Sequence, residues 1–362
     1  MNNSSEFEEV DLLVRKARIA QEKFEQKGSQ QLFDLACQAV GWALMEPEHN
    51  QRLAELAVKE TGLGNVSDKI KKNHNKTLGL LRDIKGVKSF GHVSEDEELG
   101  LSVYLRPKGV VAAIVPSTNP LATPVNNIIN ALKCGNSIIV APSPKGAQPF
   151  RELLSIIHNN LSLIGVDQDL VQMVPMPPTK GKTNRLMQLA DMLVVTGSQN
   201  NVKAGYSSGT PALGVGQGNV VTIIDETADI GDAAAKISVS KTFDNATSCS
   251  SENSVIAIET VYEEVVSSLC SEGGLVLSEE EGNRLTDIHW KNGRMTTDLL
   301  AQDIDVIIDK VDLKDRATED TKFLILPTNK AGANEVVCGE KMSRFLTLYR
   351  VKNVSEAIGT KN

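Results

Sequence analysis

The sequence predicts an α/β protein with parallel sheets, organised as two domains. At 362 residues, the chain is longer than one compact core usually supports. Short continuous apolar segments of strand length recur from residue 110 onward, and segments with helical periodicity lie between them. This alternation is typical of βαβ units, in which helices cover both faces of a parallel sheet.

The first part of the chain, up to about residue 90, is predicted to form a helical layer. Between about residues 6 and 26, apolar side chains recur at helical spacing, and Gly28 ends that pattern. Gly62 and Gly64 interrupt the periodicity further along. Three more helices are expected, over about 30–45, 50–59 and 68–82.

A parallel sheet is predicted in the middle of the chain. A short strand at 101–105 is followed by a turn at 106–109. Buried strands are expected at 110–115, 137–140, 170–174, 192–195 and 220–224. Helices are expected between them, at 122–132, 148–159, 182–189 and 199–207. We expect this first domain to span residues 1–239, with a short bridging strand at about 101–106.

A second α/β domain is predicted from about residue 240. A helix over about 230–241 leads into the segment 242–251. The elements expected after it are a helix at 261–270 and strands at 254–258, 304–308 and 322–326. We expect this domain to cover 240–346, and residues 347–362 to begin a return to the first domain.

The composition indicates an ordinary globular protein, with 41% hydrophobic and 23% charged residues. The net charge is -8, and no run of Lys or Arg is present, which argues against a nucleic-acid partner. No apolar run reaches membrane-spanning length, and the polar start of the chain is unlike a signal peptide. A cytoplasmic location is therefore expected.

The cysteines and histidines do not predict a metal site or a disulfide framework. The five cysteines are few, odd in number and far apart, and the five histidines lack the spacing of metal ligands. Reduced thiols are the simplest interpretation. One of them, Cys249, lies among small and hydroxylated residues shortly before an apolar strand. Such a setting suits a nucleophilic thiol, although a buried structural cysteine remains the alternative.

Asn119 follows the buried strand 110–115 in a turn bounded by Pro116 and Pro120. Ligands of parallel sheets bind at the carboxyl ends of strands, where an asparagine amide can donate to a developing oxyanion. The alternative is that Asn119 caps the following helix or forms an Asx-turn.

Two further segments contain glycines near strand ends. Thr196, Gly197 and Ser198 connect a strand to a helix, an arrangement that binds phosphate groups but is also typical of an ordinary serine cap. The segment 214–219 contains Gly214, Gly216 and Gly218 without the spacing of a dinucleotide fingerprint, so by itself it indicates a loop in which backbones approach closely.

Taken together, these segments resemble the aldehyde dehydrogenase superfamily, and more closely its CoA-acylating branch. That branch includes the acetaldehyde dehydrogenase half of bifunctional aldehyde–alcohol dehydrogenases. The resemblance covers almost the whole chain and is most specific around Cys249. It rests on the following segments: Glu60-Thr-Gly-Leu-Gly64, Asp68-Lys-Ile70, Lys72-Asn-His74, Pro116-Ser-Thr-Asn119-Pro120, Thr196-Gly-Ser198, Lys241 through Cys249 and Glu252, and Glu340-Lys-Met-Ser343.

The resemblance implies an NAD-binding domain over 1–239 and a catalytic domain over 240–346. Cys249 would be the nucleophile, and the Asn119 amide would help to hold the oxyanion. A small aldehyde would react with NAD and CoA to give acyl-CoA and NADH, reversibly and in a homo-oligomer. NADP is not excluded. The residues implied to bind the cofactor are Pro116, Ser117, Thr196, Gly197, Ser198, Gly214, Gly216 and Glu340.

The sequence also departs from the family's pattern. Hydrolytic members keep a glutamate base where this chain has Gly214, so a thiol acceptor becomes more plausible than water. Arg344 stands where relatives usually have proline. Family members continue well past the segment matching Glu340, which implies that the C-terminal part of the fold is missing here. The alternatives are a hydrolytic dehydrogenase or semialdehyde reductase, and a non-catalytic homologue that binds NAD or a full-length partner.

Overall fold

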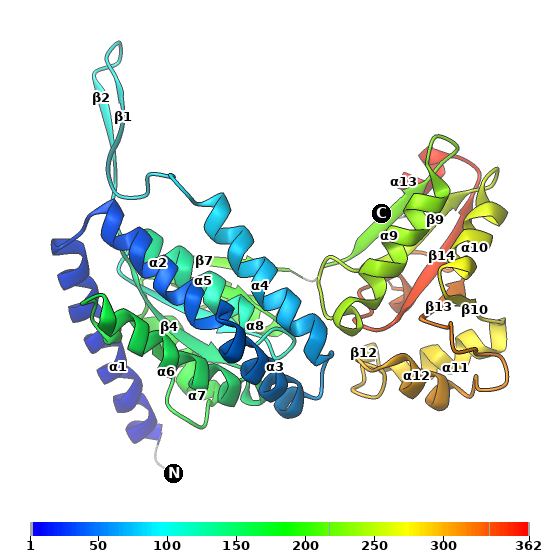
Figure 1. The fold of residues 1–362 in the computed structure, drawn as a ribbon, viewed down its shortest axis with the longest axis horizontal. Helices are drawn as coiled ribbons and strands as arrows, with labels where there is room; N and C mark the ends of the chain where they lie inside the picture. The colour runs from blue at the N-terminus through cyan, green and yellow to red at the C-terminus, as the bar shows by residue number, and fades with distance from the viewer. Residues whose placement is uncertain (1–2, 217, 333, 361–362) are drawn as a thin grey trace. The chain divides into compact units, whose positions relative to one another are not determined.

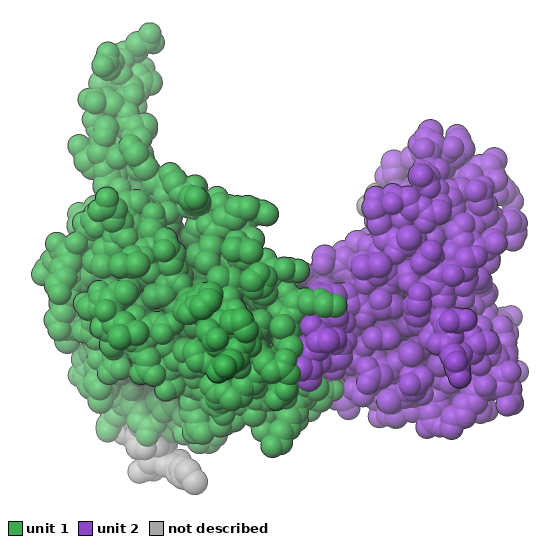
Figure 2. Space-filling model, viewed as in Figure 1, with its two compact units in different colours: residues 1–62, 69–217 green, residues 63–68, 218–362 purple. Residues whose placement is uncertain are grey.

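The chain divides into two compact units (Figures 1 and 2). Each unit contains a five-stranded parallel sheet. The structure is a computed structural model that describes residues 3–216, 218–332 and 334–360. Unit 1 comprises residues 1–62 and 69–217, and unit 2 comprises residues 63–68 and 218–362. The predicted α/β class with parallel sheets is confirmed.

The predicted helical layer of the first part of the chain is present. Ser29 begins one helix by accepting a hydrogen bond from the Leu32 amide at 3.2 Å. Gly62 ends the next helix in the left-handed conformation, with φ of 68°. The helices are α1 (Asn3–Gln26), α2 (Gln30–Met45), α3 (Pro47–Thr61) and α4 (Val66–Asp83).

The sheet of unit 1 has the strand order β5-β4-β3-β6-β7, with every neighbouring pair parallel. Its strands are β3 (Val110–Val115), β4 (Ser137–Pro142), β5 (Val171–Met173), β6 (Met192–Thr196) and β7 (Ala212–Val215). The helices are α5 (Ala122–Lys133), α6 (Ala147–Leu163), α7 (Lys180–Leu189) and α8 (Gln199–Tyr206). The fully buried β3 lies in the centre, since β4 and β6 flank it on opposite sides.

An antiparallel hairpin projects from unit 1 (Figure 1). It pairs β1 (Gly91–Asp96) with β2 (Leu101–Leu105). The strand expected at 101–105 is therefore confirmed, whereas its partner β1 was not expected. Polar residues dominate β1, so its sequence lacks the apolar pattern of a half-buried strand.

The sheet of unit 2 has the strand order β10-β13-β14-β9-β8, again parallel throughout. Its strands are β8 (Val220–Ile224), β9 (Glu252–Ile258), β10 (Gly274–Val276), β13 (Phe323–Pro327) and β14 (Phe345–Val351). The helices are α9 (Ile230–Thr242), α10 (Tyr262–Ser271), α11 (Glu279–His289), α12 (Ile304–Val311) and α13 (Val354–Thr360). A small ribbon pairs β11 (Trp290–Lys291) with β12 (Arg294–Met295).

The strand expected at 304–308 is wrong, because these residues begin helix α12. Ile304, Ile307, Ile308 and Val311 recur at helical spacing, and the last three are buried. A five-residue apolar segment is too short to distinguish a strand from one face of a helix. The helical spacing becomes clear only when the pattern is followed to Val311.

The structural division also differs from the expected domain boundaries. β8 was assigned to the first domain, but it pairs with β9 and is an edge strand of unit 2. Residues 347–362 belong to unit 2 as well, since β14 lies between β13 and β9. In both cases, the pairing of strands that are distant in sequence, and not local composition, decides which unit a segment belongs to.

Candidate active site

In unit 1, the candidate cofactor residues gather at the carboxyl ends of β3 and β6. The chain proceeds from β3 to β4 on one side, whereas β6 lies on the other side of β3. Such a reversal of strand order opens a crevice that binds nucleotides in doubly wound folds. A Cβ placed on Gly197 would lie 3.7 Å from the Cβ of Pro116, so the two turns face each other closely.

Asn119 does not cap the helix that follows it. Helix α5 begins at Ala122, its N-cap position is Leu121, and no side chain caps it. The side chain of Asn119 is partly exposed and forms no hydrogen bond with any residue that the structure describes. The capping interpretation of Asn119 is therefore wrong, and its amide donors remain available to a ligand.

Ser198 does cap its helix, because its hydroxyl accepts a hydrogen bond from the Asn201 amide at 3.3 Å. Gly197, with φ of 144°, brings the chain into that cap. Gly214 lies in β7, and a Cβ there would come within 2.8 Å of the side chains of Tyr206 and Val202. Packing against α8 thus explains the glycine at 214. Gly216 follows β7, and the adjoining Gln217 lies outside the described residues.

In unit 2, Cys249 is exposed in the loop that leads into β9. The alternative interpretation, a buried structural thiol, is therefore wrong. Cys37, by contrast, is a buried structural thiol, and its burial raises the pKa of that thiol to about 12. Burial also raises the pKa of Cys134 and of Cys270.

An unusual left-handed turn precedes Cys249. Asp244, Asn245 and Ala246 have φ values of 49°, 53° and 61°. Non-glycine residues adopt this region at a cost of about 1–2 kcal/mol each, so three in succession need support from their surroundings. All three side chains are buried. Backbone strain of this kind is concentrated at functional sites.

Hydrogen bonds from distant segments hold that turn. The Asp244 amide donates to the carboxylate of Asp68 at 2.8 Å, and the Asp244 carboxylate accepts from the Asn65 amide at 3.0 Å. The side-chain amide of Asn245 donates to Asp303 at 2.9 Å and to the Ala301 carbonyl at 3.2 Å. The turn before the cysteine is thus fixed by two segments of unit 2 that are remote in sequence.

The carboxylate of Glu340 lies on the same side of unit 2 as Cys249. A Cβ placed on Gly218 would lie 3.6 Å from the Cβ of Cys249 and 3.9 Å from Oε1 of Glu340. Cys249 and the carboxylate of Glu340 therefore both lie next to Gly218. Burial raises the pKa of Glu340, and the positive charge of Lys241 offsets part of that rise.

Lys241 closes the loop that carries Cys249. Its fully buried ammonium group donates to the Glu252 carbonyl at 2.9 Å, which ties the end of α9 to the start of β9. Burial lowers the pKa of Lys241 to about 7, against smaller opposing effects of the carboxylates of Glu252 and Glu340.

The lowered pKa of Lys241 predicts a distinctive pH dependence of stability. Between pH 7 and the ordinary lysine value of 10.5, the unfolded chain holds a proton that the folded chain has lost. The free energy of unfolding therefore rises with pH across that window, by up to about 1.4 kcal/mol per pH unit. Lys241→Met removes this term, so wild type should gain stability over the variant as pH rises from 7 to 10 in urea unfolding.

The exposed Lys236, on the same helix, provides the control for that measurement. Its ion pair with Asp232 raises the pKa of Lys236 rather than lowering it. Lys236→Met should therefore track wild type from pH 7 to pH 10. A stability difference between wild type and Lys241→Met that stays constant over this range would show that Lys241 does not titrate there.

The structure thus assembles the expected site residues in two groups. Unit 1 brings together Pro116, Ser117, Asn119, Thr196, Gly197 and Ser198, and unit 2 brings together Cys249 and Glu340. The first group fits a dinucleotide phosphate, because a glycine at the strand-order reversal leaves room beside a capped helix N-terminus. Asp68, Lys241 and Asp303 were missed as supporting residues. In the sequence, Lys241 and Asp68 stand out only as members of family-like motifs, and nothing local marks Asp303.

Neither a metal centre nor a membrane span is found in the described ranges. No group of three His, Cys, Asp or Glu side chains there is arranged to hold a metal ion. None of the helices described has both the length and the apolar character needed to cross a bilayer.

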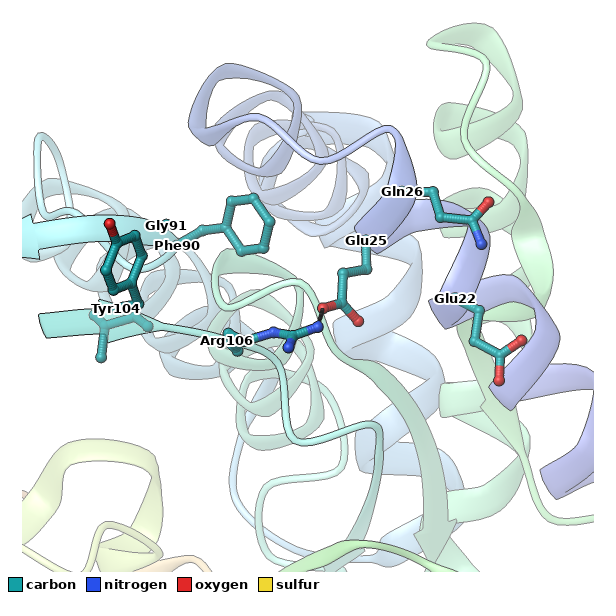
Figure 3. A pocket seen from close by; sticks show the side chains of 8 residues that line it. Glu22, Glu25, Gln26, Phe90, Gly91, Tyr104 and Arg106 are labelled. Carbon is teal, nitrogen blue, oxygen red and sulfur yellow. Dashed lines mark hydrogen bonds and ion pairs between the residues drawn. The ribbon is translucent and has the colours of Figure 1, made fainter.

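A pocket of about 720 Å³ lies in unit 1 at the base of the β1–β2 hairpin (Figure 3). Arg106 points across it and pairs with Glu25 at 3.0 Å, and the ring of Phe90 lies alongside. Because its charge is already paired and none of the candidate residues lines it, we do not assign the chemistry to this pocket.

A parallel sheet with a reversal of strand order, and an exposed cysteine near a glutamate, are typical of α/β enzymes that work through a thiol nucleophile and a nicotinamide cofactor. Residues 3–273 match the model of the aldehyde dehydrogenase family. The chain is 48% identical over 351 residues to sulfoacetaldehyde dehydrogenase (acylating) of Cupriavidus necator, covering 97% of this chain and 71% of that protein.

Solved structures agree with this match. An acetylating aldehyde dehydrogenase from Geobacillus thermoglucosidasius superposes with a TM-score of 0.93 at 34% identity, over 99% of this chain and 78% of that one. Propionaldehyde dehydrogenase from Rhodopseudomonas palustris, solved with bound CoA and an acylated cysteine, gives a TM-score of 0.85 at 27% identity, over 97% of this chain and 79% of that one.

The chain belongs to the aldehyde dehydrogenase family, within its CoA-acylating branch. It is a CoA-acylating aldehyde oxidoreductase that uses a nicotinamide cofactor. The branch suggested by the departure at Gly214 is therefore confirmed.

Proposed function

We propose that this chain converts sulfoacetaldehyde, NAD and CoA to sulfoacetyl-CoA and NADH, reversibly, through a thioester on Cys249. The observation that carries the chemistry is the exposed Cys249, held after a braced left-handed turn and beside Glu340. The choice of aldehyde is supported by the relative from Cupriavidus necator, whose name specifies sulfoacetaldehyde. The exposed position of Cys249 leaves its sulfur open to an aldehyde and to a second thiol.

Cys249 carries the acyl group between two acceptors. Its thiolate adds to the aldehyde carbon, and the carbonyl oxygen becomes an oxyanion held by the Asn119 amide and the Cys249 backbone N–H. Bound NAD supplies the acceptor for the hydride that the adduct must lose. Cys249 then holds a thioester, which the CoA thiolate attacks, and the Cys249 thiolate leaves. One aldehyde, one NAD and one CoA give one acyl-CoA, one NADH and one proton.

The cofactor-binding residues are assigned by their positions in the fold. Thr196, Gly197 and Ser198 would hold the phosphates, because backbone N–H groups at a helix start favour anions. Pro116 and Ser117 would line the facing wall of the same crevice. Glu340 would hold the nicotinamide ribose beside Cys249. For Gly214 and Gly216 we propose only that their backbone borders the cofactor.

The acyl acceptor should be a thiol rather than water. A hydrolytic route needs a carboxylate to activate water, and Gly214 supplies no side chain at the corresponding position. The space beside Gly214 is already filled by Tyr206 and Val202. Water would therefore attack the Cys249 thioester without a general base at this position.

The test is NADH formation from sulfoacetaldehyde with and without CoA, together with identification of the product. We expect NADH only when CoA is present, and sulfoacetyl-CoA as the product. Equal NADH without CoA, with free sulfoacetate as the product, would instead establish hydrolytic chemistry. The same assay with NADP decides the choice of cofactor.

A further inference from the structure

Arg344 lies just before β14, the central strand of the unit 2 sheet, and its guanidinium has no hydrogen-bonding partner among the described residues. Its side chain is partly exposed, but its Nε is covered and has no acceptor. Within the described ranges, no residue forms a hydrogen bond or a close ion pair with this guanidinium. A guanidinium carries five N–H donors and keeps its charge in proteins, so unpaired donors at a half-covered position cost free energy.

The strand register places Arg344 near the nucleophile. β14 and β9 are parallel neighbours in which Thr347 is paired with Ser254. When this register is continued toward the start of both strands, Arg344 comes level with Ser251, just beyond Cys249. The arginine and the cysteine therefore lie at the same end of two adjacent strands.

The carboxylates that attract Arg344 are engaged elsewhere. Burial lowers the pKa of Arg344, and Asp303, Asp68 and Asp305 offset part of that effect. Asp68 accepts from the Asp244 amide at 2.8 Å, and Asp303 accepts from the Asn245 side chain at 2.9 Å. Both carboxylates thus brace the turn before Cys249. Their negative charges stabilise the charged guanidinium at this position, but they accept no hydrogen bond from it.

We propose that Arg344 binds the anionic head group of the aldehyde and thereby makes the enzyme selective for sulfoacetaldehyde over neutral aldehydes. A sulfonate offers three oxygens to the planar donor fork, which suits oxyanions better than a lysine does. The sulfonate is joined to the carbon next to the carbonyl, so a residue close to Cys249 is positioned to hold it. This inference rests on the proposed function, because Cys249 must attack the same molecule.

The test compares two aldehydes that differ in charge but have similar shape. In 3,3-dimethylbutanal, a neutral tert-butyl group replaces the sulfonate of sulfoacetaldehyde. We expect Arg344→Gln to lower kcat/KM for sulfoacetaldehyde about 100-fold, mainly through KM, because bonds to a charged group are lost. For 3,3-dimethylbutanal, kcat/KM should change less than about 3-fold, since no such bonds exist.

Arg344→Lys is the second variant, because it keeps the charge and loses the fork. We expect a loss of about 10-fold for sulfoacetaldehyde and little change for the neutral aldehyde. If Arg344→Gln fails to fold, Arg344→Lys still allows the two aldehydes to be compared. Equal losses on both aldehydes would make Arg344 a structural counter-ion of the aspartates and overturn the inference.

The wild-type enzyme separates the two proposals. CoA-dependent oxidation of 3,3-dimethylbutanal without any preference for sulfoacetaldehyde would overturn the role of Arg344 and leave the acylating chemistry intact. No CoA-dependent oxidation of either aldehyde by wild type would overturn the proposed function itself.

Discussion

Replacement of Cys249 by alanine should abolish turnover, by at least about 10⁴-fold in kcat, because the proposed site then lacks the thiol that carries the acyl group. Cys249 is exposed, and its loop is held by contacts that do not involve the sulfur. The fold and the affinity for NAD should therefore survive the substitution. The assays are CoA-dependent NADH formation and NAD titration of the same preparation.

Intact mass provides a second readout for this prediction. Wild type incubated with an acyl-CoA should gain the mass of one acyl group, and Cys249→Ala should not. Cys270→Ala is the matched control, since Cys270 is the other exposed cysteine and lies on α10. It should keep both activity and adduct. Full turnover by Cys249→Ala, or an adduct that persists without this sulfur, would exclude Cys249 as the nucleophile.

Replacement of Asn119 by alanine should lower kcat by about 10²–10³-fold with little change in KM. A donor aimed at the oxyanion stabilises the transition state by about 3–4 kcal/mol and contributes little to the ground state. The side chain of Asn119 forms no hydrogen bond with the described residues, so its loss should not disturb the fold. Steady-state kinetics with sulfoacetaldehyde, NAD and CoA would measure the effect.

Asn119→Asp distinguishes a donor from an acceptor. Aspartate keeps the shape and the acceptor oxygen of asparagine, but it loses both N–H donors. If the side chain serves the oxyanion, the aspartate variant should be at least as impaired as the alanine variant. Normal activity in Asn119→Asp would mean that no donor from this side chain is needed and would exclude its role at the oxyanion.

Much of the local structure could be predicted from the sequence. Continuous apolar segments such as 110–115 are typical of a strand that is buried on both faces, and β3 occupies those residues. The family could be recognised for a similar reason, because Cys249 and Glu340 occur in short segments of specific composition. Periodicity was less informative in short segments, and residues 304–308 were mistaken for a strand on that account.

The supporting parts of the site could not be predicted. Asp68 belongs to a family-like segment and Asp303 to an ordinary helix start, but neither sequence shows a supporting role. That role arises because the fold brings the two carboxylates to Asp244 and Asn245. The position of Gly218 in the site could not be predicted either. Nothing in the sequence distinguishes it from other glycines, and only the structure places Cys249 and Glu340 beside it. Hydrogen bonds between residues far apart in sequence leave no local pattern.

By itself, the sequence determined the α/β class and most of the strands and helices, and it singled out Cys249 as the candidate nucleophile, because each depends on residues within a few positions of one another. Only the tertiary structure decided that Cys249 is exposed, that Asn119 does not cap α5, and that Arg344, just before β14, has no hydrogen-bonding partner among the described residues. Exposure, capping and the pairing of charges depend on which distant segments pack together, and parallel strands obtain their neighbours through long crossovers.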